Sequence, residues 1–219
     1  MIKLIQGDCL EVMKEIPDKS VDLVLTDPPY GMSFKSNYRE EKYKEIINDS
    51  DLSWLDYFVN EIYRVTKENT AHYVFCSFHN IDLFKQALEK KFTIKNLLVW
   101  EKNNTGMGDL TADFASKTEF IWFIQKGRRE IIGSRDPNIF TARKTGNNFH
   151  PTEKPIDLME YLLSKFSNSE DTILDPFMGA GSTGIACKLS KRKFIGIELD
   201  QDYFKIAQDR INNTQSQLF

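Results

Sequence analysis

The 219-residue sequence lacks any run of about 18 consecutive apolar residues, so it predicts no membrane-spanning helix. It has only three cysteines, Cys9, Cys76 and Cys187, which are far apart and have no partners at metal-ligand spacing. This excludes a disulfide framework and a zinc motif, and it is typical of free thiols in a reducing cytosol. The chain begins with a strand-like stretch instead of a signal peptide. We therefore expect a cytoplasmic protein with no bound metal.

The sequence also lacks an overall positive charge. Its formal net charge is −3, which is not typical of a generic nucleic-acid-binding protein. One segment differs, because residues 126–154 contain seven Lys or Arg against three acids, a local charge of +4. The length and the 41% hydrophobic content predict one domain with an ordinary buried core.

The first informative stretch is Asp27-Pro28-Pro29-Tyr30, which follows the apolar run Val21–Thr26. That run has the composition of a buried parallel strand. The prolines end the strand, since neither can donate to a ladder of backbone hydrogen bonds. An acid, two rigid prolines and an aromatic ring therefore lie at the C-terminal edge of a sheet, where open α/β folds bind ligands. The alternative is a simple proline turn with a surface tyrosine.

These four residues suit the exocyclic amine of a nucleobase, a weak nucleophile whose lone pair is delocalised into the ring. The Asp27 carboxylate and the Pro28 carbonyl can accept its two N–H bonds, which localises the lone pair on nitrogen. Pro28 and Pro29 hold these acceptors in place before the reaction. Tyr30 offers a flat face for a base that has been turned out of a duplex. In this respect the chain resembles the amino-methylating DNA methyltransferases, whose signature is [D/N/S]-P-P-[Y/F/W].

A second motif begins at Asp175, at the end of the short apolar strand Thr172–Asp175. Pro176-Phe177-Met178-Gly179-Ala180-Gly181-Ser182-Thr183-Gly184 follows, then a helix over residues 185–190 and a strand Lys193–Glu198. The glycines permit a tight turn and a close approach of backbone to ligand. Glu198 would lie at the tip of the neighbouring strand, where it could accept both hydroxyls of a ribose.

The three glycines also fit the dinucleotide fingerprint, so a nicotinamide-dependent enzyme is an alternative for this segment. Two details argue against it: Asp175-Pro176-Phe177 stands where a hydrophobic strand normally enters the first glycine, and Asp27–Tyr30 has no role in hydride transfer. The form D-P-F-x-G-x-G-[S/T]-T resembles the S-adenosylmethionine loop of the same methyltransferases. The resemblance implies that S-adenosylmethionine is the cofactor, held by Asp8, Cys9, Lys154, Asp175, Pro176, Phe177, Gly179, Gly181, Ser182, Thr183, Glu198 and Leu199. Asp8 can equally be the N-cap of a helix that starts at Cys9, and both roles can hold together.

The order of the motifs predicts the fold. The strand that carries Asp27 precedes the cofactor loop in the chain. In a methyltransferase sheet a further strand is expected after Lys193–Glu198 and its helix, and here that strand is the first in the chain, Ile2–Gln6. This order resembles the β group of amino-methyltransferases, a circularly permuted class I methyltransferase fold. We expect an α/β, doubly wound sheet of seven strands with an antiparallel edge pair. The strands are Ile2–Gln6, Val21–Thr26, Ala71–Cys76, Ile94–Trp100, Glu119–Gln125, Thr172–Asp175 and Lys193–Glu198.

The remaining segments are expected to recognise the substrate within this single domain. The polar stretch at about 31–50 suggests a lid over cofactor and DNA, although it can also be a plain surface loop. The stretch 103–117 suggests a second loop, and the basic segment at about 126–150 occupies the place of a target-recognition region in the family. Its phosphate-binding residues would be Lys126, Arg128, Arg129, Arg143 and Lys144, with a merely solvated basic loop as the alternative.

The resemblance implies site-specific methylation of adenine N6 in double-stranded DNA, with base flipping, because Asp at position 27 goes mostly with adenine in this family. Methylation of cytosine N4 is the alternative. From another class, a catalytically silent DNA-binding relative would be expected to lack Asp27 or the glycines, and the chain has both. Relatives that methylate RNA or protein glutamine usually place the cofactor loop first. A homodimer and a companion restriction endonuclease fit this interpretation.

Overall fold

The computed structural model describes residues 1–30, 52–105, 110–146, 149 and 152–215. The strands are β1 (Ile2–Gln6), β2 (Leu23–Thr26), β3 (Thr70–Cys76), β4 (Thr93–Lys102), β5 (Thr118–Lys126), β6 (Ile139–Ala142), β7 (Thr172–Asp175) and β8 (Lys193–Glu198). The helices are α1 (Cys9–Val12), α2 (Leu55–Val65), α3 (Ile81–Leu88), α4 (Ile156–Phe166), α5 (Ser182–Leu189) and α6 (Gln201–Asn213). None of these helices is long and apolar enough to cross a membrane.

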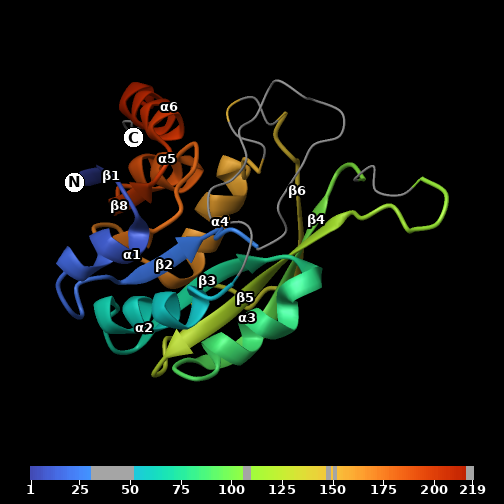
Figure 1. Ribbon diagram of the computed structural model, residues 1–219, viewed down its shortest axis with the longest axis horizontal. Coiled ribbons are helices and arrows are strands. Elements are labelled where there is room, and N and C mark those ends of the chain that lie inside the picture. The colour runs from blue at the N-terminus through green and yellow to red at the C-terminus, as the bar shows by residue number, and fades with distance from the viewer. Residues whose placement is uncertain (31–51, 106–109, 147–148, 150–151, 216–219) are drawn as a thin grey trace.

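One sheet contains all eight described strands, in the order β1-β8-β7-β2-β3-β5-β4-β6 (Figure 1). From β1 to β3 the neighbours are parallel, so the C-terminal ends of these strands share one edge. The first strand of the chain pairs with the last, Ile2 opposite Phe194 and Gln6 opposite Glu198. This pairing is the one that a circularly permuted methyltransferase order predicts.

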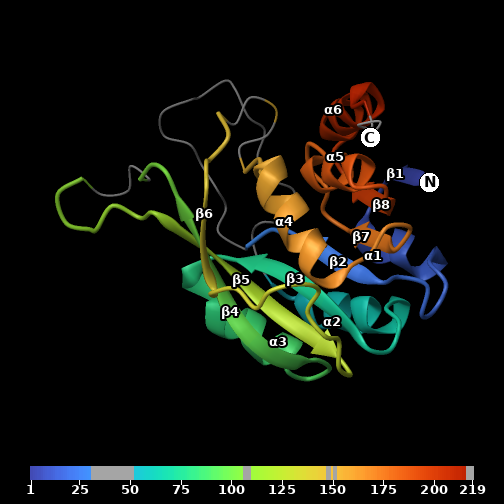
Figure 2. The ribbon, with the colours of Figure 1, turned by 180° about the vertical axis from the view of Figure 1, so that it is seen from behind.

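The other end of the sheet contains the expected antiparallel pair and one strand more than expected. β5 runs antiparallel to both β3 and β4. β6 then pairs with β4 in parallel, from Val99 opposite Ile139 to Lys102 opposite Ala142 (Figure 2). The prediction of seven strands was therefore short by one. β6 is only four residues long and half-exposed, so its sequence carries little hydrophobic signal.

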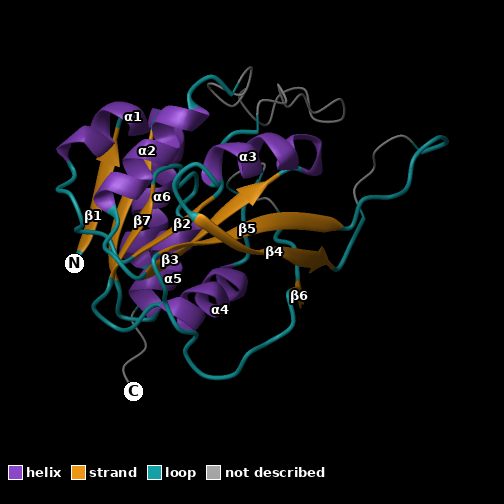
Figure 3. Cartoon of the chain, turned by 90° about the horizontal axis from the view of Figure 1, so that it is seen from below, coloured by secondary structure: helices purple, strands orange, loops and turns teal. Residues whose placement is uncertain are grey.

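Helices cover both faces of the sheet, as a doubly wound fold requires. Figure 3 shows α1, α2 and α3 on one face and α4 and α5 on the other. The two cores follow from strand alternation, since Val24 packs with the first group and Leu23 and Leu25 pack with the second. Trp100 and Trp122 are both buried.

The three cysteines are buried and free. Burial raises the pKa of Cys76 to about 12 and raises the pKa values of Cys9 and Cys187 as well, so all three thiols remain protonated at neutral pH. None of them is a candidate nucleophile.

His72 joins β2 to β3 and gives the fold a pH dependence. Its Nδ1 accepts from the Val24 N–H at 3.1 Å, and its Nε2 lies 3.1 Å from Thr70 Oγ1. Burial, with a further contribution from Lys126, lowers the pKa of His72 to about 3. The folded protein then binds fewer protons than the unfolded chain between pH 6.5 and 3. The contribution of His72 to the free energy of unfolding is complete above pH 6.5 and is lost as the pH falls.

We predict that the free energy of unfolding of the wild-type protein falls about 1.5 kcal/mol more between pH 6.5 and 5 than that of His72→Asn. Asn can accept the same Val24 N–H bond but does not titrate. Urea unfolding at the two pH values measures the difference. If the free energy of unfolding depends on pH equally in the two proteins, His72 is not the cause of this pH dependence.

Candidate active site

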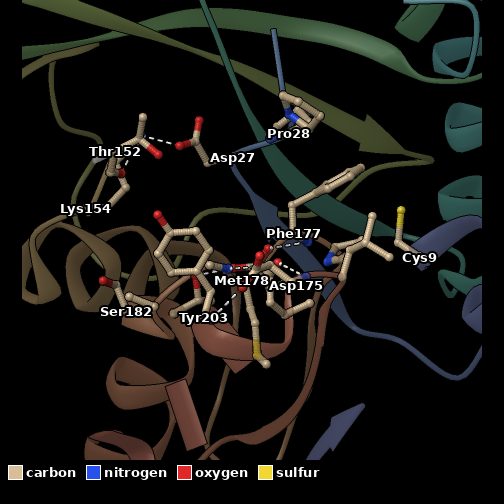
Figure 4. A pocket seen from close by; sticks show the side chains of 18 of the residues that line it. Cys9, Asp27, Pro28, Thr152, Lys154, Asp175, Phe177, Met178, Ser182 and Tyr203 are labelled. Atoms are coloured by element: carbon tan, nitrogen blue, oxygen red, sulfur yellow. Dashed lines mark hydrogen bonds and ion pairs between the residues drawn. The ribbon is translucent and has the colours of Figure 1, made fainter. Parts of the chain in front are cut away.

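The ends of four parallel strands surround one cavity at the C-terminal edge of the sheet. Figure 4 shows Asp27, Thr152 and Lys154 on one side, Cys9 on the opposite side, and Phe177, Met178 and Asp175 between them. The two sequence motifs, about 150 residues apart in the chain, therefore line the same cavity, as predicted. It is lined by Gly7, Asp8, Cys9, Leu10, Asp27, Pro28, Pro29, Tyr30, Trp54, Thr152, Glu153, Lys154, Met159, Asp175, Pro176, Phe177, Met178, Gly179, Ala180, Ser182, Thr183, Glu198, Leu199, Asp200 and Tyr203.

Asp27 stands directly at the end of β2, and both of its oxygens are engaged. The Tyr30 hydroxyl donates to Oδ1, and the Lys154 ammonium donates to Oδ2. A carboxylate has about four lone-pair sites, so Asp27 retains acceptor capacity toward the cavity. The Tyr30 ring packs edge-to-face on Phe84, with centroids 6.4 Å apart, and Asn80 donates to the Tyr30 carbonyl. Asp27 and Tyr30 are thus held in place by contacts on several sides.

Lys154 connects Asp27 to a further pair of charges. Its ammonium lies 3.3 Å from Glu119 Oε2, a charge contact without hydrogen-bond geometry, and Glu119 Oε1 accepts from Lys102 at 3.1 Å. The side chain of Lys154 is only 6% exposed and that of Asp27 15%. Cations and anions thus alternate along a partly buried row, Lys102–Glu119–Lys154–Asp27, which we call the charge row.

The charge row sets the protonation of its members. Burial raises the pKa of Asp27, and the Lys154 ammonium opposes that rise. Burial acts the other way on Lys154, but Asp27 and Glu119 outweigh it, so the pKa of Lys154 is raised and its ammonium stays charged. Burial also acts to raise the pKa of Glu119, yet its two neighbouring ammoniums leave it lowered. Among the described residues, Asp27 has one ammonium neighbour where Glu119 has two, so Lys154 is the cation that favours the charged form of Asp27.

Asp175 supports the glycine loop from beneath. Its carboxylate accepts from Thr26 Oγ1 at 2.9 Å, Thr183 Oγ1 at 2.7 Å and the Phe177 N–H at 3.2 Å. Burial raises the pKa of Asp175 to about 7 in spite of these donors. Asp175 therefore joins the tips of β2 and β7 to the start of α5, which fixes one motif against the other.

Glu198 closes the loop from the side of β8. Its Oε2 accepts from the Gly179 N–H and its Oε1 from the Asp200 N–H, both at 2.9 Å. Each oxygen keeps a lone pair for a further donor, such as a sugar hydroxyl. Burial raises the pKa of Glu198, and the two backbone bonds oppose this. A carboxylate held in this way beside a glycine turn can accept from the hydroxyls of a ribose.

Asp8 lies at the tip of β1, beside Glu198, because Gly7 N–H donates to the Glu198 carbonyl at 2.9 Å. Its Oδ1 accepts from the Leu10 N–H at 2.8 Å, so Asp8 is the N-cap of α1. It also lines the cavity. The structure thus shows that Asp8 caps α1 and that it also faces the cavity.

Gly181 is the predicted cofactor residue that does not line the cavity. Its φ is +83°, and a Cβ there would lie 3.0 Å from Ile211 Cδ1 and 3.1 Å from Ala207 Cβ. Gly181 instead lets α5 approach α6 closely, as does Gly184, where a Cβ would lie 2.4 Å from Ile211 Cδ1. Two glycines of the motif are therefore required for helix packing.

Three of the predicted DNA-binding residues lie in the wrong place for this cavity. Lys126 is 3% exposed, with its ammonium bonded to the Tyr63 carbonyl at 2.8 Å and the Thr66 carbonyl at 2.9 Å, so it cannot reach a phosphate. Arg128 and Arg129 follow the end of β5, and because β5 is antiparallel this end lies at the sheet edge opposite the cavity. Arg143 and Lys144 follow β6, which ends at the cavity edge.

The sequence did not indicate several residues that shape the cavity. Trp54 lines it, with its ring centroid 5.4 Å from that of Phe177. Arg210 on α6 donates to Glu153 Oε1 and to the Ala180 carbonyl, each at 2.6 Å, and so ties the segment before α4 to the glycine loop. These pairs are far apart in the chain, and only a charged residue on an otherwise apolar face could have suggested them. The stretch 31–50, His150 and part of 103–117 lie outside the described residues.

Comparison with known proteins agrees with this geometry. A model of the N6/N4 DNA methylase family matches residues 21–141 and 134–209. The chain belongs to the N6/N4 DNA methylase family. Within these segments lie both the catalytic motif and the glycine loop of the methylase.

The methylase has close relatives along its whole length. YubD of Escherichia coli (strain K12) is 34% identical over 216 residues, which cover 98% of this chain and 92% of that protein. The DNA adenine methyltransferase YhdJ of the same strain is 30% identical over 245 residues, covering 95% and 82%. The crystal structure of M1.HpyAVI in complex with S-adenosylmethionine has a TM-score of 0.75 at 29% identity and covers 96% of the methylase and 100% of that chain.

Proposed function

We propose that the methylase transfers a methyl group from S-adenosylmethionine to the exocyclic N6 amine of adenine in double-stranded DNA, at a specific site and on a flipped base. The observation that carries this proposal is the placement of Asp27 and Pro28 across one cavity from Glu198 and the glycine loop. The acceptor pair for an amine and the acceptor for a ribose thus face a shared space.

Each part of the cavity has a role in this reaction. Asp27 and the Pro28 carbonyl accept the two N–H bonds of the amine, and the rigid Pro28-Pro29 pair keeps them preorganised. The Tyr30 ring stacks on the flipped base. No group here has to remove a proton first, because the amine loses its proton as, or after, it is methylated.

The other half of the cavity fits the cofactor. Bound S-adenosylmethionine supplies an electrophilic methyl group on its sulfonium. Glu198 accepts from the ribose hydroxyls, and Asp8 with the Cys9 backbone lies against the adenine. Phe177 and Gly179 position the sulfonium, and the Phe177 ring packs against those of Trp54 and Phe58, each with a centroid distance of 5.4 Å. Lys154, Asp175, Pro176, Ser182, Thr183 and Leu199 complete this wall.

Two observations favour adenine over cytosine N4. Asp27 is the first residue of the catalytic motif, and Asp there goes mostly with adenine in this family. YhdJ, which matches 95% of the chain, is named a DNA adenine methyltransferase. A catalytically silent DNA-binding protein is disfavoured because Asp27 and the glycine loop are both present and both line the cavity, Gly181 and Gly184 excepted.

DNA is held by the segments around the cavity edge. Arg143 and Lys144 supply phosphate contacts, and the stretches at about 31–50 and 103–117 add target recognition within one domain. Two of the relatives, M2.MboI and M2.LlaDCHI, are named type II methyltransferases, which supports a companion restriction endonuclease. A homodimer would give so small a protein a second set of recognition loops.

The DNA-binding assignment predicts a change in salt dependence. Replacing Arg143 and Lys144 with Ala should flatten the slope of log K against log salt concentration by about 2, since each phosphate contact contributes about 0.9. Arg128→Ala is the matched control, because it removes an exposed guanidinium at the opposite sheet edge. Fluorescence anisotropy with duplex DNA at several salt concentrations measures the slopes. An unaltered slope in the double variant would place the DNA on another face.

The Glu198 assignment predicts a defect in cofactor binding. Glu198→Ala should weaken the binding of S-adenosylmethionine by about 1–3 kcal/mol, the cost of losing hydrogen bonds to a charged acceptor. Glu198→Gln, which keeps one carbonyl acceptor, should lose less. Isothermal titration calorimetry gives the dissociation constants. If both variants bind like the wild type, Glu198 does not hold the ribose.

Methylation of plasmid DNA with labelled cofactor, followed by nucleoside analysis, tests the function as a whole. The expected product is N6-methyladenine. N4-methylcytosine would select the alternative base, and the absence of any methylated nucleoside would select the silent relative. Single-molecule sequencing of the same plasmid reports the target site.

A further inference from the structure

A second cavity lies between the sheet and α4, at the opposite edge from the active site. Its volume is about 610 Å³, within the range of cavities that hold small ligands. It shares no lining residue with the active-site cavity. The lining comes from the first half of β4, the end of β5, the second half of α4 and residues 128–140, which pass over it. Its lining residues are Tyr73, Lys95, Asn96, Leu98, Phe123, Gln125, Arg128, Arg129, Glu130, Ile131, Arg135, Asp136, Pro137, Asn138, Phe140, Tyr161, Leu162, Lys165 and Phe166.

The wall of this cavity is aromatic. Tyr73, Phe123 and Phe166 form one group, with centroids 4.6 Å apart for Phe123 and Phe166 and 5.3 Å for Tyr73 and Phe123. Phe140 and Tyr161 form a second group, 5.5 Å apart. Flat rings in the wall of a cavity can hold a flat ligand by stacking.

The rim of this cavity is cationic. Five Lys or Arg side chains line it against two acids. Lys165 is neutralised by Asp136, which also accepts from the Tyr161 hydroxyl at 2.9 Å, and Arg128 lies 3.3 Å from Glu130. Three cations, Lys95, Arg129 and Arg135, thus have no acidic partner among the described residues, which favours an anionic ligand.

The Tyr73 hydroxyl is available to a ligand in this cavity. Tyr73 lines the cavity, and among the residues that the structure describes none forms a hydrogen bond with its hydroxyl. A tyrosine hydroxyl can both donate and accept, so a ligand group in this cavity can bond to it. The ligand should therefore carry a hydrogen-bonding group beside its flat ring.

We propose that this second cavity binds a nucleotide, with its base between the two aromatic groups, its phosphate on Arg129 and Arg135, and a base or sugar group on the Tyr73 hydroxyl. A nucleotide combines a flat ring, a hydrogen-bonding edge and a negative charge. The site gives a role to Arg129, which the sequence assigned to DNA but which lies at the edge opposite the active site. It is independent of the methyl-transfer chemistry.

Binding and location are tested together. The four ribonucleoside 5′-monophosphates are titrated calorimetrically into the wild type, Tyr73→Phe and the double variant Arg129→Ala/Arg135→Ala, with Lys3→Ala as a control that removes one cation on β1. We expect at least one nucleotide to bind with a dissociation constant below 1 mM, at least 10-fold weaker binding in the double variant, a smaller loss in Tyr73→Phe, and no change in the control. The corresponding nucleoside without phosphate should bind at least 10-fold more weakly. Thermal unfolding verifies that each variant is folded.

Photolabelling locates the site. Cross-linking with 8-azidoadenosine 5′-monophosphate and peptide mapping should modify peptides from residues 128–140 or 158–166. Labels confined to residues 1–30 or 175–203 would assign the nucleotide to the active site and overturn the proposal, as would the absence of binding by all four nucleotides. Tighter binding of a short single-stranded oligonucleotide, lost in the same double variant, would support a nucleotide within a strand instead of a free one. Loss of duplex DNA binding in the double variant without any nucleotide binding would overturn the proposal.

Discussion

Asp27→Ala is expected to abolish methyl transfer and to leave the affinity for S-adenosylmethionine within a few-fold of the wild type. In the proposed reaction Asp27 provides one of the two acceptors for the amine, and the Pro28 carbonyl alone would not localise the nitrogen lone pair. Removal of a single preorganised group of this kind costs about 10²–10³ in rate, and here the group contacts the nucleophile itself. Of the proposed cofactor residues only Lys154 bonds to Asp27, so the geometry of the others should survive the change.

Two measurements separate the outcomes for Asp27. Transfer of labelled methyl groups to plasmid DNA gives the rate, and calorimetry gives the cofactor affinity. Tyr30→Phe is the matched control, because it removes the hydroxyl that donates to Asp27 but keeps the carboxylate and the ring. It should retain far more activity than Asp27→Ala. Turnover of Asp27→Ala at the level of Tyr30→Phe would exclude the role given to the carboxylate.

The position of the active site could be predicted because it depends on local signals. An apolar run that ends in an acid marks a strand tip, and this pattern occurs at Asp8, Asp27, Asp175 and Glu198. In a parallel sheet such tips share one edge, so four short patterns fix one cleft. The helix and strand ends differed by a few residues, as for α5, which begins at Ser182 and not at residue 185.

The predictions that failed concern side chains whose position depends on the direction of a strand or on a partner that is distant in the chain. Arg128 and Arg129 follow a strand that the sequence correctly paired as antiparallel, and this direction carries them away from the cleft. Lys126 is charged but buried, because backbone carbonyls of Tyr63 and Thr66 satisfy its ammonium. A charge count along the chain cannot distinguish such a lysine from one on the surface.

The charge row is a further feature that no local pattern predicts, because Lys102, Glu119 and Lys154 come from three separate segments. Their meeting depends on the β4–β5 register, in which Glu101 pairs with Thr118, and on the segment that precedes α4. The row suggests a role for Lys154 beyond the proposed cofactor binding. Its ammonium opposes the rise that burial causes in the pKa of Asp27 and so favours the ionised form, which offers all of its acceptor sites to an amine.

Lys154→Met should therefore reduce methyl transfer by about 10² or more at pH 7, since the loss of one partner leaves a buried charge uncompensated at a cost of about 3–5 kcal/mol. Lys154 lowers the pKa of Asp27 against burial and against Glu119, so its removal moves that pKa upward. A larger fraction of Asp27 is then protonated at each pH, and the rate of the variant should rise with pH further into the alkaline range than the rate of the wild type.

The pH profile of the rate at saturating cofactor distinguishes this role from simple loss of binding. Lys154→Arg keeps the positive charge and should retain the wild-type profile at a reduced rate. Lys102→Met removes the ammonium that touches Glu119 but not Asp27, so it should shift the profile less than Lys154→Met. If Lys154→Met loses activity with an unshifted profile, Lys154 acts only on the shape of the cavity, and the ionisation of Asp27 does not depend on it.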